Sequence, residues 1–393
     1  MKLKKIADNV YMIACLDWDR RLFDSLIPLP DGTSYNSYII KGSEKTVMVD
    51  SVDPEFSDLL LHHLQDIKKI DFIIANHAEQ DHSGTIPKVL EKYPDSKVIT
   101  TAIGRSLLMA HLHIPKDRFQ TVNDGESISL GDKTLEFMHM PWVHWPETMV
   151  TYLREDKMLF SCDFFGSHIA TTDTFVTDER RVYEAAKRYY AEIMMPFRKM
   201  IQKHLARLAE YNIELIAPSH GPAYNKPEFI LEAYKEWVSD QPKNVVVVPY
   251  ISMHGSTRKL VNRLVQGLAN EGITVYQFDL AVTDIGKLAI ALVDAATIVV
   301  GVPTVRSSPH PNVMYALNVA NVVVPKARYA AVLNSYGWSN ESTLAAVTNA
   351  IPNLKVEVVG AVGCKGLPTA ETYKEVDQLV RTISEKHKED NLI

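Results

Sequence analysis

Residues 76–85 read NHAEQDHSGT, and they bring His77, Glu79, Asp81 and His82 close together in the chain. The apolar run DFIIANH, which ends at His77, has the composition of a buried strand. Side chains two positions apart on an extended segment point to the same side, so the first three ligand-type residues are expected to converge, with His82 reaching them from the next position. Such residues are usually solvated in loops, but four of them at the end of a buried strand favour a metal site.

Three further ligand-type residues follow predicted strands. His144 lies in MPWVHWPETM, Asp163 ends KMLFSCD, and His220 ends IELIAPSH. Because loops that follow strands gather at one edge of a sheet, these side chains are expected near the first cluster. The other histidines lack such a setting, and His204 and His387, for example, are predicted on helix surfaces.

The composition excludes several classes of protein. A net charge of −6 and a pI near 6.2 indicate neither a nucleic-acid partner nor a membrane-surface partner. The sequence has no apolar run of the roughly 18 residues that a membrane-spanning helix needs. Its three cysteines (Cys15, Cys162 and Cys364) have no CxxC spacing, so we expect a reducing cytoplasm and no thiolate metal site.

The chain is predicted to form two domains, residues 1–243 and 244–393, joined by a polar segment that contains Pro242. In the first domain, residues 148–163 are predicted to form a hairpin that turns at Arg154-Glu155-Asp156. A helical apolar period runs from Glu179 to about Tyr211, and Pro196 is expected to split it.

The second domain has five strand–helix units. Their apolar strands predict a doubly wound parallel sheet, an α/β fold, with both faces covered by helices. Strands are expected over 244–252, 274–280, 297–303, 329–335 and 355–361, and helices over 257–270, 284–294, 310–322, 340–350 and up to about residue 387.

The first strand–helix turn of this domain, ISMHGSTRK, has the chemistry of an anion-binding site. Ser252, Ser256 and Thr257 offer hydroxyl groups, Gly255 lets the backbone approach closely, and the following helix directs its first N–H groups at the same place. The turn has neither a Walker lysine pattern nor GxGxxG. Hydroxyl residues also cap helices for structural reasons alone, but a site at the strand ends of a doubly wound sheet favours ligand binding.

Two sequence patterns resemble known families. The H-x-E-x-D-H box, followed by His144, Asp163 and His220, resembles the metallo-β-lactamase fold, which implies an αββα sandwich with a two-metal site at its edge. Glu79 stands where the hydrolases of that superfamily have a histidine, and a carboxylate-rich set of ligands suits iron better than zinc. The resemblance implies His77, Glu79 and His144 on one iron, Asp81, His82 and His220 on the other, and Asp163 between them.

The loops of the second domain resemble flavodoxin and imply FMN. Tyr336 and Trp338 could stack on a flat ring, although packing is their alternative role. The sequence of residues 305–310 differs from the one most common in flavodoxins at this loop. The residues implied as FMN contacts are Ser252, Met253, His254, Gly255, Ser256, Thr257, Pro303, Thr304, Val305, Arg306, Ser335, Tyr336, Gly337, Trp338 and Ser339.

Together the two patterns resemble the flavodiiron proteins over essentially the whole chain. This resemblance implies reduction of O2 to water, of NO to N2O, or of both, with electrons passing from an external donor through FMN to the iron. The donor is expected to be rubredoxin, a flavin reductase or a reduced deazaflavin. The family also implies a head-to-tail homodimer, with a dimer of dimers as a larger option, and a tyrosine near the metals that is either Tyr189 or Tyr190.

Two other functions compete with this interpretation. One is a hydrolase of the metallo-β-lactamase type with a fused flavodoxin, against which Glu79 argues. The other is a non-catalytic flavin redox sensor, which would not need a complete set of metal ligands. For the enzyme, Met140, Trp142, Trp145 and Phe164 are a hypothetical lining for a gas path, with packing as their default role.

Overall fold

The computed structural model describes residues 3–339 and 341–393. The chain forms two compact units, and each is described by itself. The first consists of Met1–Tyr190 and Phe197–Val238, and the second of Ala191–Pro196 and Ser239–Ile393. Among the described residues, no helix combines the length and the apolar character that crossing a membrane requires.

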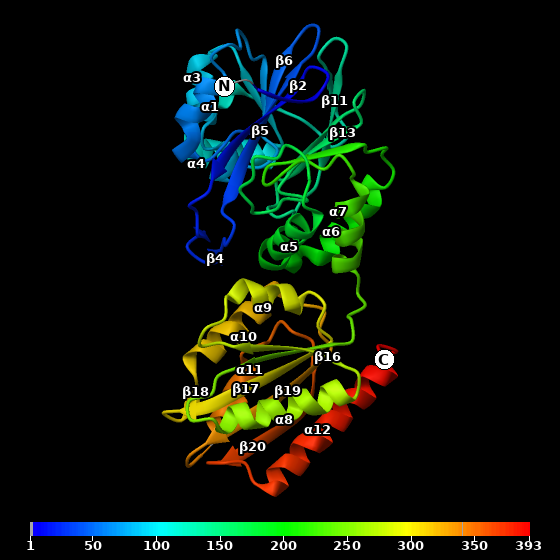
Figure 1. Ribbon diagram of the computed structural model, residues 1–393. Helices are drawn as coiled ribbons and strands as arrows, with labels where there is room; N and C mark the ends of the chain where they lie inside the picture. The colour runs from blue at the N-terminus through cyan, green and yellow to red at the C-terminus, as the bar shows by residue number, and fades with distance from the viewer. Residues whose placement is uncertain (1–2, 340) are drawn as a thin grey trace. The chain divides into compact units, whose positions relative to one another are not determined.

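Two β-sheets form the centre of the first unit (Figure 1). The seven-stranded sheet has the order β1-β2-β5-β6-β7-β8-β9, and the five-stranded sheet runs in chain order from β10 to β14. A short ribbon of β3 (Leu22–Phe23) and β4 (Ile27–Pro28) extends from the first sheet's loops. The remaining strands are β1 (Lys4–Ala7), β2 (Val10–Asp17), β5 (Thr33–Lys41), β6 (Thr46–Val49), β7 (Phe72–Ile74), β8 (Lys97–Thr100), β9 (Phe119–Thr121), β10 (Ser127–Ser129), β11 (Thr134–His139), β12 (Met149–Leu153), β13 (Met158–Cys162) and β14 (Leu215–Pro218).

The sheets pack face to face around a shared apolar core. Ile40, Val47 and Ile74 come from the seven-stranded sheet, and they pack with Phe137 and Phe160 from the other. Helices cover the outer faces (Figure 1), so the αββα sandwich expected for the first domain is confirmed. The helices of this unit are α1 (Ser57–His63), α2 (Gln80–Ser83), α3 (Ile86–Lys92), α4 (Ala102–Leu112), α5 (Glu179–Tyr189), α6 (Arg198–Leu208) and α7 (Glu228–Val238).

The long helix predicted from residue 179 is interrupted near Pro196, as expected. After α5, residues Tyr190–Met194 form a turn of π-helix, and Met195–Phe197 form a 3-10 turn that contains Pro196. A proline removes one backbone donor and crowds the preceding turn, so the chain restarts as α6 only after it.

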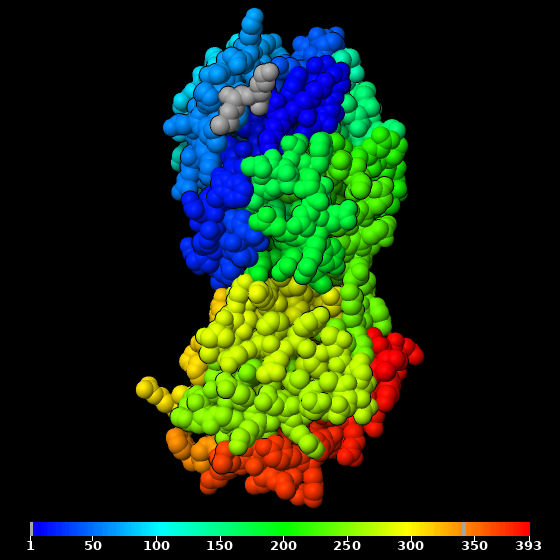
Figure 2. Space-filling model, in the orientation of Figure 1, coloured from blue at the N-terminus to red at the C-terminus, as the bar shows by residue number. Residues whose placement is uncertain are grey.

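The second unit contains a parallel sheet with the order β16-β15-β17-β19-β20, and β18 pairs antiparallel with β17. Helices α8 and α12 cover one face of this sheet, and α9 and α10 lie on the other (Figure 1). Figure 2 shows the residues of α12, drawn in red, at the surface of this unit. The strands are β15 (Val245–Tyr250), β16 (Thr274–Asp279), β17 (Thr297–Val305), β18 (Ser308–Pro309), β19 (Tyr329–Tyr336) and β20 (Glu357–Lys365), and the helices are α8 (Ser256–Asn270), α9 (Ile285–Leu292), α10 (Pro311–Val323), α11 (Glu341–Asn349) and α12 (Ala370–Glu389).

The doubly wound fold predicted for this region is confirmed, with two differences. The central strands β15, β17 and β19 are buried, whereas the edge strands β16 and β20 are partly exposed because each has only one neighbour. The sequence did not predict β18, which folds back on β17 after a turn at Arg306 and Ser307. Asn340, where a helix was predicted to begin, lies outside the described residues.

Candidate functional site

The segment NHAEQDHSGT (residues 76–85) follows β7 and leads into the short helix α2. Glu79 is the N-cap of α2 in an extended conformation, and Asp81 and His82 lie within α2 itself. The expectation that His77, Glu79 and Asp81 converge along one extended segment was therefore wrong in its geometry. The turn of the chain into α2 separates the side chains into two groups, with His77 and Glu79 in one and Asp81 and His82 in the other.

The first group contains His77, Glu79, His144 and Asp163. The Nε2 atoms of both histidines lie 3.1 Å from Oε2 of Glu79. The same nitrogens lie 3.5 Å (His77) and 3.4 Å (His144) from Oδ2 of Asp163. Two imidazole nitrogens and two carboxylate oxygens therefore face one small volume, which could hold a metal ion.

The second group contains Asp81, His82 and His220, and it faces the other oxygen of Asp163. Oδ1 of Asp163 lies 2.9 Å from Nε2 of His82 and 3.4 Å from Nε2 of His220. Asp81 contacts the same nitrogens, at 3.3 Å from His82 and 3.2 Å from His220. Asp163 thus turns one oxygen toward each group, as a bridging carboxylate between two metals would.

Unpaired buried atoms test whether metal ions fit this site. Both carboxylate oxygens of Asp81, both of Asp163 and both ring nitrogens of His82 are buried without a hydrogen-bond partner among the described residues. Leaving one buried polar group unsatisfied costs about 1–3 kcal/mol, so the cluster fits cations at its centre. The Cys162 thiol also lies close to His82 and Asp163, but its pKa is raised by burial, which opposes the thiolate form that binds metals.

The side chains of the cluster shift one another's pKa values. Burial lowers the pKa of His144, but the facing carboxylates of Asp163 and Glu79 outweigh it and raise that pKa to about 9. Burial likewise opposes the charge on His220, whose pKa is raised to about 10 by Asp163 and Asp81. Burial raises the pKa of Asp163, but the facing imidazoles outweigh it and hold that pKa well below its usual range. The site thus favours negative carboxylates facing positive charge.

Residues that sequence analysis did not single out hold the ligands in place. Nδ1 of His220 donates to the backbone carbonyl of Ser34 at 2.7 Å. Nδ1 of His77 donates to Oε1 of Glu147 at 2.7 Å. These bonds leave Nε2 of each ring free to face a metal, because a neutral imidazole carries only one proton.

The structure distinguishes the two candidate tyrosines. The Tyr189 ring lies 4.8 Å from the ring of His168 and 5.8 Å from that of His220. Burial and then the negative charge of Asp163 raise the pKa of Tyr189. The Tyr190 ring instead packs on Trp237 at 5.4 Å, and its hydroxyl donates to the Trp237 carbonyl. Tyr189 is therefore the tyrosine beside the candidate metal centre.

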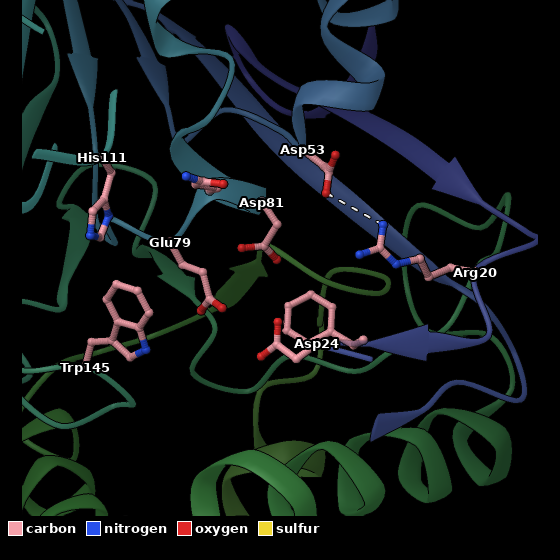
Figure 3. A pocket seen from close by; sticks show the side chains of 9 residues that line it. Arg20, Asp24, Asp53, Glu79, Asp81, His111 and Trp145 are labelled. Atoms are coloured by element: carbon pink, nitrogen blue, oxygen red, sulfur yellow. Dashed lines mark ion pairs between the residues drawn. The ribbon is translucent and has the colours of Figure 1, made fainter. Parts of the chain in front are cut away.

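A cavity of about 320 Å³ opens beside the first group of ligands. Figure 3 shows the carboxylates of Glu79 and Asp81 directed into it, with Asp24 facing them and Arg20 paired to Asp53 at 3.8 Å. Most of this lining could not be predicted from the sequence, because many of its residues lie in loops, where side chains follow no regular period. The lining residues are Arg20, Phe23, Asp24, Asp53, Glu79, Gln80, Asp81, His111 and Trp145.

Of the four residues in the hypothetical gas path, Trp145 alone lines this cavity. Its ring stands edge-on to His77 at 5.0 Å. Met140 and Phe164 are fully buried in packing, and Trp142 is 45% exposed and stacks on Phe197. For Met140, Trp142 and Phe164, a role in packing therefore fits the structure better than a role in a gas path.

A second cavity, of about 200 Å³, lies at the carboxyl ends of the strands of the second unit. Gly255 precedes α8 with a φ of +89°, and no atom lies within 4 Å of the position that a Cβ would take. The hydroxyls of Thr257 and Ser335 are joined at 2.8 Å beneath it. An open backbone cradle at a helix N-terminus fits the phosphate of a mononucleotide. The lining residues are Met253, His254, Ser256, Pro303, Thr304, Ser335, Tyr336, Gly337 and Gly366.

Some residues implied as FMN contacts lie outside this lining. The Ser252 hydroxyl accepts from the backbone N–H of Arg258, so it caps α8. Val305 ends β17 and Arg306 begins the turn to β18, while Trp338 is 75% exposed and Ser339 is also exposed. Gly366 was missed, although its position directly after the fifth strand of a parallel sheet was a usable signal.

Comparisons with known proteins show the family of the chain. Residues 33–221 match the family model described as ODP family beta lactamase. A nitric oxide reductase of Moorella thermoacetica is 34% identical over 390 residues, which is 96% of this chain and 97% of the relative. The chain belongs to the flavodiiron protein family. The resemblance inferred from the motifs is thereby confirmed.

Other members of the flavodiiron family support the same assignment. A coenzyme F420H2 oxidase of Methanothermobacter marburgensis is 33% identical, over 79% of this chain and 80% of that relative. The structure of rubredoxin oxygen:oxidoreductase from Desulfovibrio gigas superposes with a TM-score of 0.94 at 28% identity, covering 100% of both chains. A flavodiiron protein from Giardia intestinalis superposes with a TM-score of 0.90 at 25% identity, over 99% of this chain and 98% of that one.

Proposed function

We propose that this protein is a flavodiiron oxidoreductase that reduces O2 to water, NO to N2O, or both. Two iron ions would be held by the clustered side chains of the first unit, and FMN by the cradle of the second. The observation that carries the proposal is Asp163, which turns one buried, unpaired oxygen toward each of two ligand groups. Relatives named for nitric oxide reduction and for F420H2 oxidation support the reaction class.

The ligand residues would be assigned as follows. His77, Glu79 and His144 would hold one iron and Asp81, His82 and His220 the other, with Asp163 as the bridge. The set has nitrogen and oxygen donors, which suits iron, and Glu79 replaces the histidine that favours zinc in hydrolases. The hydrolase alternative is weakened accordingly, and the sensor alternative does not explain the buried cluster.

FMN, when bound, accepts electrons singly or in pairs, and iron, when bound, offers coordination positions to a diatomic gas. The side chains of this unit bind and orient the ions. The Tyr189 hydroxyl would keep a proton beside Asp163, since its pKa is raised. Phe23 and Trp145 in the cavity wall would limit the entry of water, while small gases pass apolar surfaces readily.

The FMN site would use the turn before α8. Backbone N–H groups at the start of α8 and the hydroxyl groups of Ser256 and Thr257 would bind the phosphate, which a helix N-terminus also attracts. Tyr336 and Gly337 would lie against the ring system, as members of the same cavity lining. The exposed Trp338 would then contact the flavin or a partner protein.

We further propose a head-to-tail homodimer, with a dimer of dimers as a larger option, in the cytoplasm. Large apolar side chains remain exposed near both cavities, including Leu22 and Leu26 in the first unit and Met253 and Leu367 in the second. A second copy of the chain would cover them. The three cysteines are free thiols, which suits a reducing compartment. The electron donor would be rubredoxin, a flavin reductase or a reduced deazaflavin.

Gas-consumption kinetics test the proposal. Purified protein with measured iron and FMN contents is reduced without oxygen and mixed with O2 and, separately, with NO, using each class of donor. We expect rapid oxidation by at least one gas and slow oxidation of a Glu79→Ala variant. Zinc in place of iron after growth with ample iron, or equal gas consumption by the variant, would contradict the proposal.

The dimer has its own test. One variant depleted of iron (Asp163→Asn) and one with weakened FMN binding (Gly255→Ala), isolated at a flavin concentration that leaves it unloaded, are co-expressed with different affinity tags, and the mixed dimer is isolated. If FMN of one chain serves iron of the other, the mixed dimer regains part of the activity that each pure variant lacks. Activity in a protein that stays monomeric by light scattering would contradict the head-to-tail arrangement.

A further inference from the structure

The two groups of metal ligands differ in what supports their histidines. Nδ1 of His77 donates to a carboxylate, whereas Nδ1 of His220 donates to a backbone carbonyl. Nδ1 of His82 is buried and has no partner among the described residues. The outer partner of an imidazole ligand tunes how strongly it donates to a metal, so the two metal positions are chemically unequal.

Glu147 is built into this position. Its Oε1 accepts hydrogen bonds from Nδ1 of His77 at 2.7 Å and from the backbone N–H of Ala78 at 2.9 Å. The Thr101 hydroxyl donates to its backbone carbonyl at 3.1 Å, and the residue is only 2% exposed. The second oxygen, Oε2, is buried without a partner among the described residues. The negative charge of Glu147 therefore acts mainly on His77, because its second oxygen has no partner among the described residues that would neutralise it.

We propose that Glu147 is a positioning residue that fixes the His77 ring and lowers the reduction potential of the iron bound by His77, relative to the iron bound by His82 and His220. This inference rests on the proposed function, since it requires iron at both positions. A carboxylate that accepts the outer N–H makes the imidazole a stronger donor. Its negative charge also stabilises the ferric ion more than the ferrous ion, because the attraction grows with the ion's charge.

The main variant is Glu147→Gln, which keeps the shape and removes the charge. Ala78 N–H and His77 Nδ1–H both point at one oxygen, so the glutamine carbonyl is expected to remain there and hold the ring. Removal of an outer partner typically changes metal affinity by about 10–100-fold. A tenfold loss of ferric over ferrous preference corresponds to an upward shift of about 59 mV for a one-electron couple.

Glu136→Gln is the matched control. Glu136 lies in the same unit and accepts from the Tyr211 hydroxyl and from Arg154, each at 2.6 Å. Its replacement removes a similar charge and disturbs similar hydrogen bonds, but it touches no metal ligand. We expect it to change stability and to leave both iron potentials unaltered.

The experiment is a redox titration of the iron- and FMN-loaded protein, followed by electron paramagnetic resonance, with iron counted in every sample. One of the two iron potentials should rise in Glu147→Gln, the other should move less, and neither should move in Glu136→Gln. Equal potentials in wild type and Glu147→Gln, both fully loaded, would overturn the inference. Wild-type protein without iron would instead overturn the proposed function.

Two measurements keep the inference testable if Glu147→Gln does not fold. Glu147→Asp keeps the charge but shortens the reach, so iron should bind less tightly while the lower potential is mostly retained; a rise as large as that expected for the glutamine variant would count against it. In zinc-loaded wild-type protein, nitrogen-15 NMR should find one histidine Nδ1–H proton in a strong charge-assisted hydrogen bond. Its absence would also overturn the inference.

Discussion

Asp163 and His82 face each other across the centre of the cluster, with Oδ1 of Asp163 at 2.9 Å from Nε2 of His82. Both side chains are fully buried, so neither group is hydrated by solvent. Burial lowers the pKa of His82, but the charges of Asp163 and Asp81 outweigh it, and the pKa is raised. A metal ion between the two residues would replace the proton on His82.

Replacing Asp163 by asparagine should therefore disrupt both metal positions. The amide keeps one oxygen acceptor but loses the charge and the second oxygen that the other ligand group needs. We expect the iron content to fall from two ions per chain to about one or fewer, and gas reduction to fall by at least about 100-fold. Iron analysis and gas-consumption rates measure this directly. Asp124→Asn is the control, because Asp124 is a surface partner of Arg207, and this variant should keep its iron.

The two neighbouring tyrosines make a matched pair of substitutions. Tyr189→Phe removes a hydroxyl beside the metal cluster, and we expect turnover to fall by about tenfold or more, with a changed pH profile. Tyr190→Phe removes the hydrogen bond to the Trp237 carbonyl, so it should lower the free energy of unfolding by about 1 kcal/mol and leave turnover unchanged. Rates measured across pH, together with urea unfolding, separate the two outcomes. Equal turnover losses would show that both effects arise from packing.

Much of the fold and the metal cluster could be predicted from local patterns. Alternating and continuous apolar runs mark the strands, and His77, Glu79, Asp81 and His82 are neighbours in the chain, so their joint location needed no tertiary knowledge. Glu147 could not be found in this way, because it meets His77 across 70 residues of sequence. Which of two consecutive tyrosines faces the metals was also undecidable, since the π-turn after Tyr189 breaks the regular helical period.

The phosphate cradle offers a test with another matched pair. Gly255 and Gly272 both have positive φ values, +89° and +77°, and a Cβ at either would meet no atom within 4 Å. Alanine in this conformation costs about 1–2 kcal/mol, so both variants should lose similar stability. Only Gly255→Ala places a methyl group at the N-terminus of α8, and we expect it alone to weaken FMN binding, by at least about tenfold. Fluorescence titration of the flavin-free protein measures the affinity. Similar loss in both variants would indicate strain without a specific cradle.

The expectation that His387 and His204 lie on helix surfaces was wrong. His204 is only 8% exposed, and its Nε2 donates to the carbonyl of Pro141. His387 is fully buried between Thr297 and Asn244, with 2.8 Å contacts on both ring nitrogens. The helical period of α12 does place position 387 on the inner side of that helix, next to Ile383 and Ser384. Two polar partners, Thr297 in β17 and Asn244 just before β15, make a buried imidazole acceptable there.

The buried His387 predicts a specific sensitivity to acid. Burial lowers its pKa, although Asp390 acts in the opposite direction. The unfolded chain then binds a proton more readily than the folded one, so the stabilisation is complete above the ordinary histidine pKa of about 6.5 and is lost as pH falls below it. Each unit by which the pKa is lowered is worth about 1.4 kcal/mol. The protection factors of the α12 and β17 amides in hydrogen exchange, corrected for the pH dependence of intrinsic exchange, should therefore fall between pH 7 and pH 5.

His387→Gln provides the decisive comparison for this acid sensitivity. The glutamine amide can donate to Asn244 and accept from Thr297, but it does not titrate in this range. The variant should be less stable than wild type at pH 7 and should lose less additional stability at pH 5. His62→Gln, at an exposed position on α1, is the control and should leave the pH dependence of the second unit unchanged. If His387→Gln and wild type lose the same stability between pH 7 and pH 5, the acid sensitivity of this unit arises from its carboxyl groups, and His387 serves only to pack α12 against the sheet.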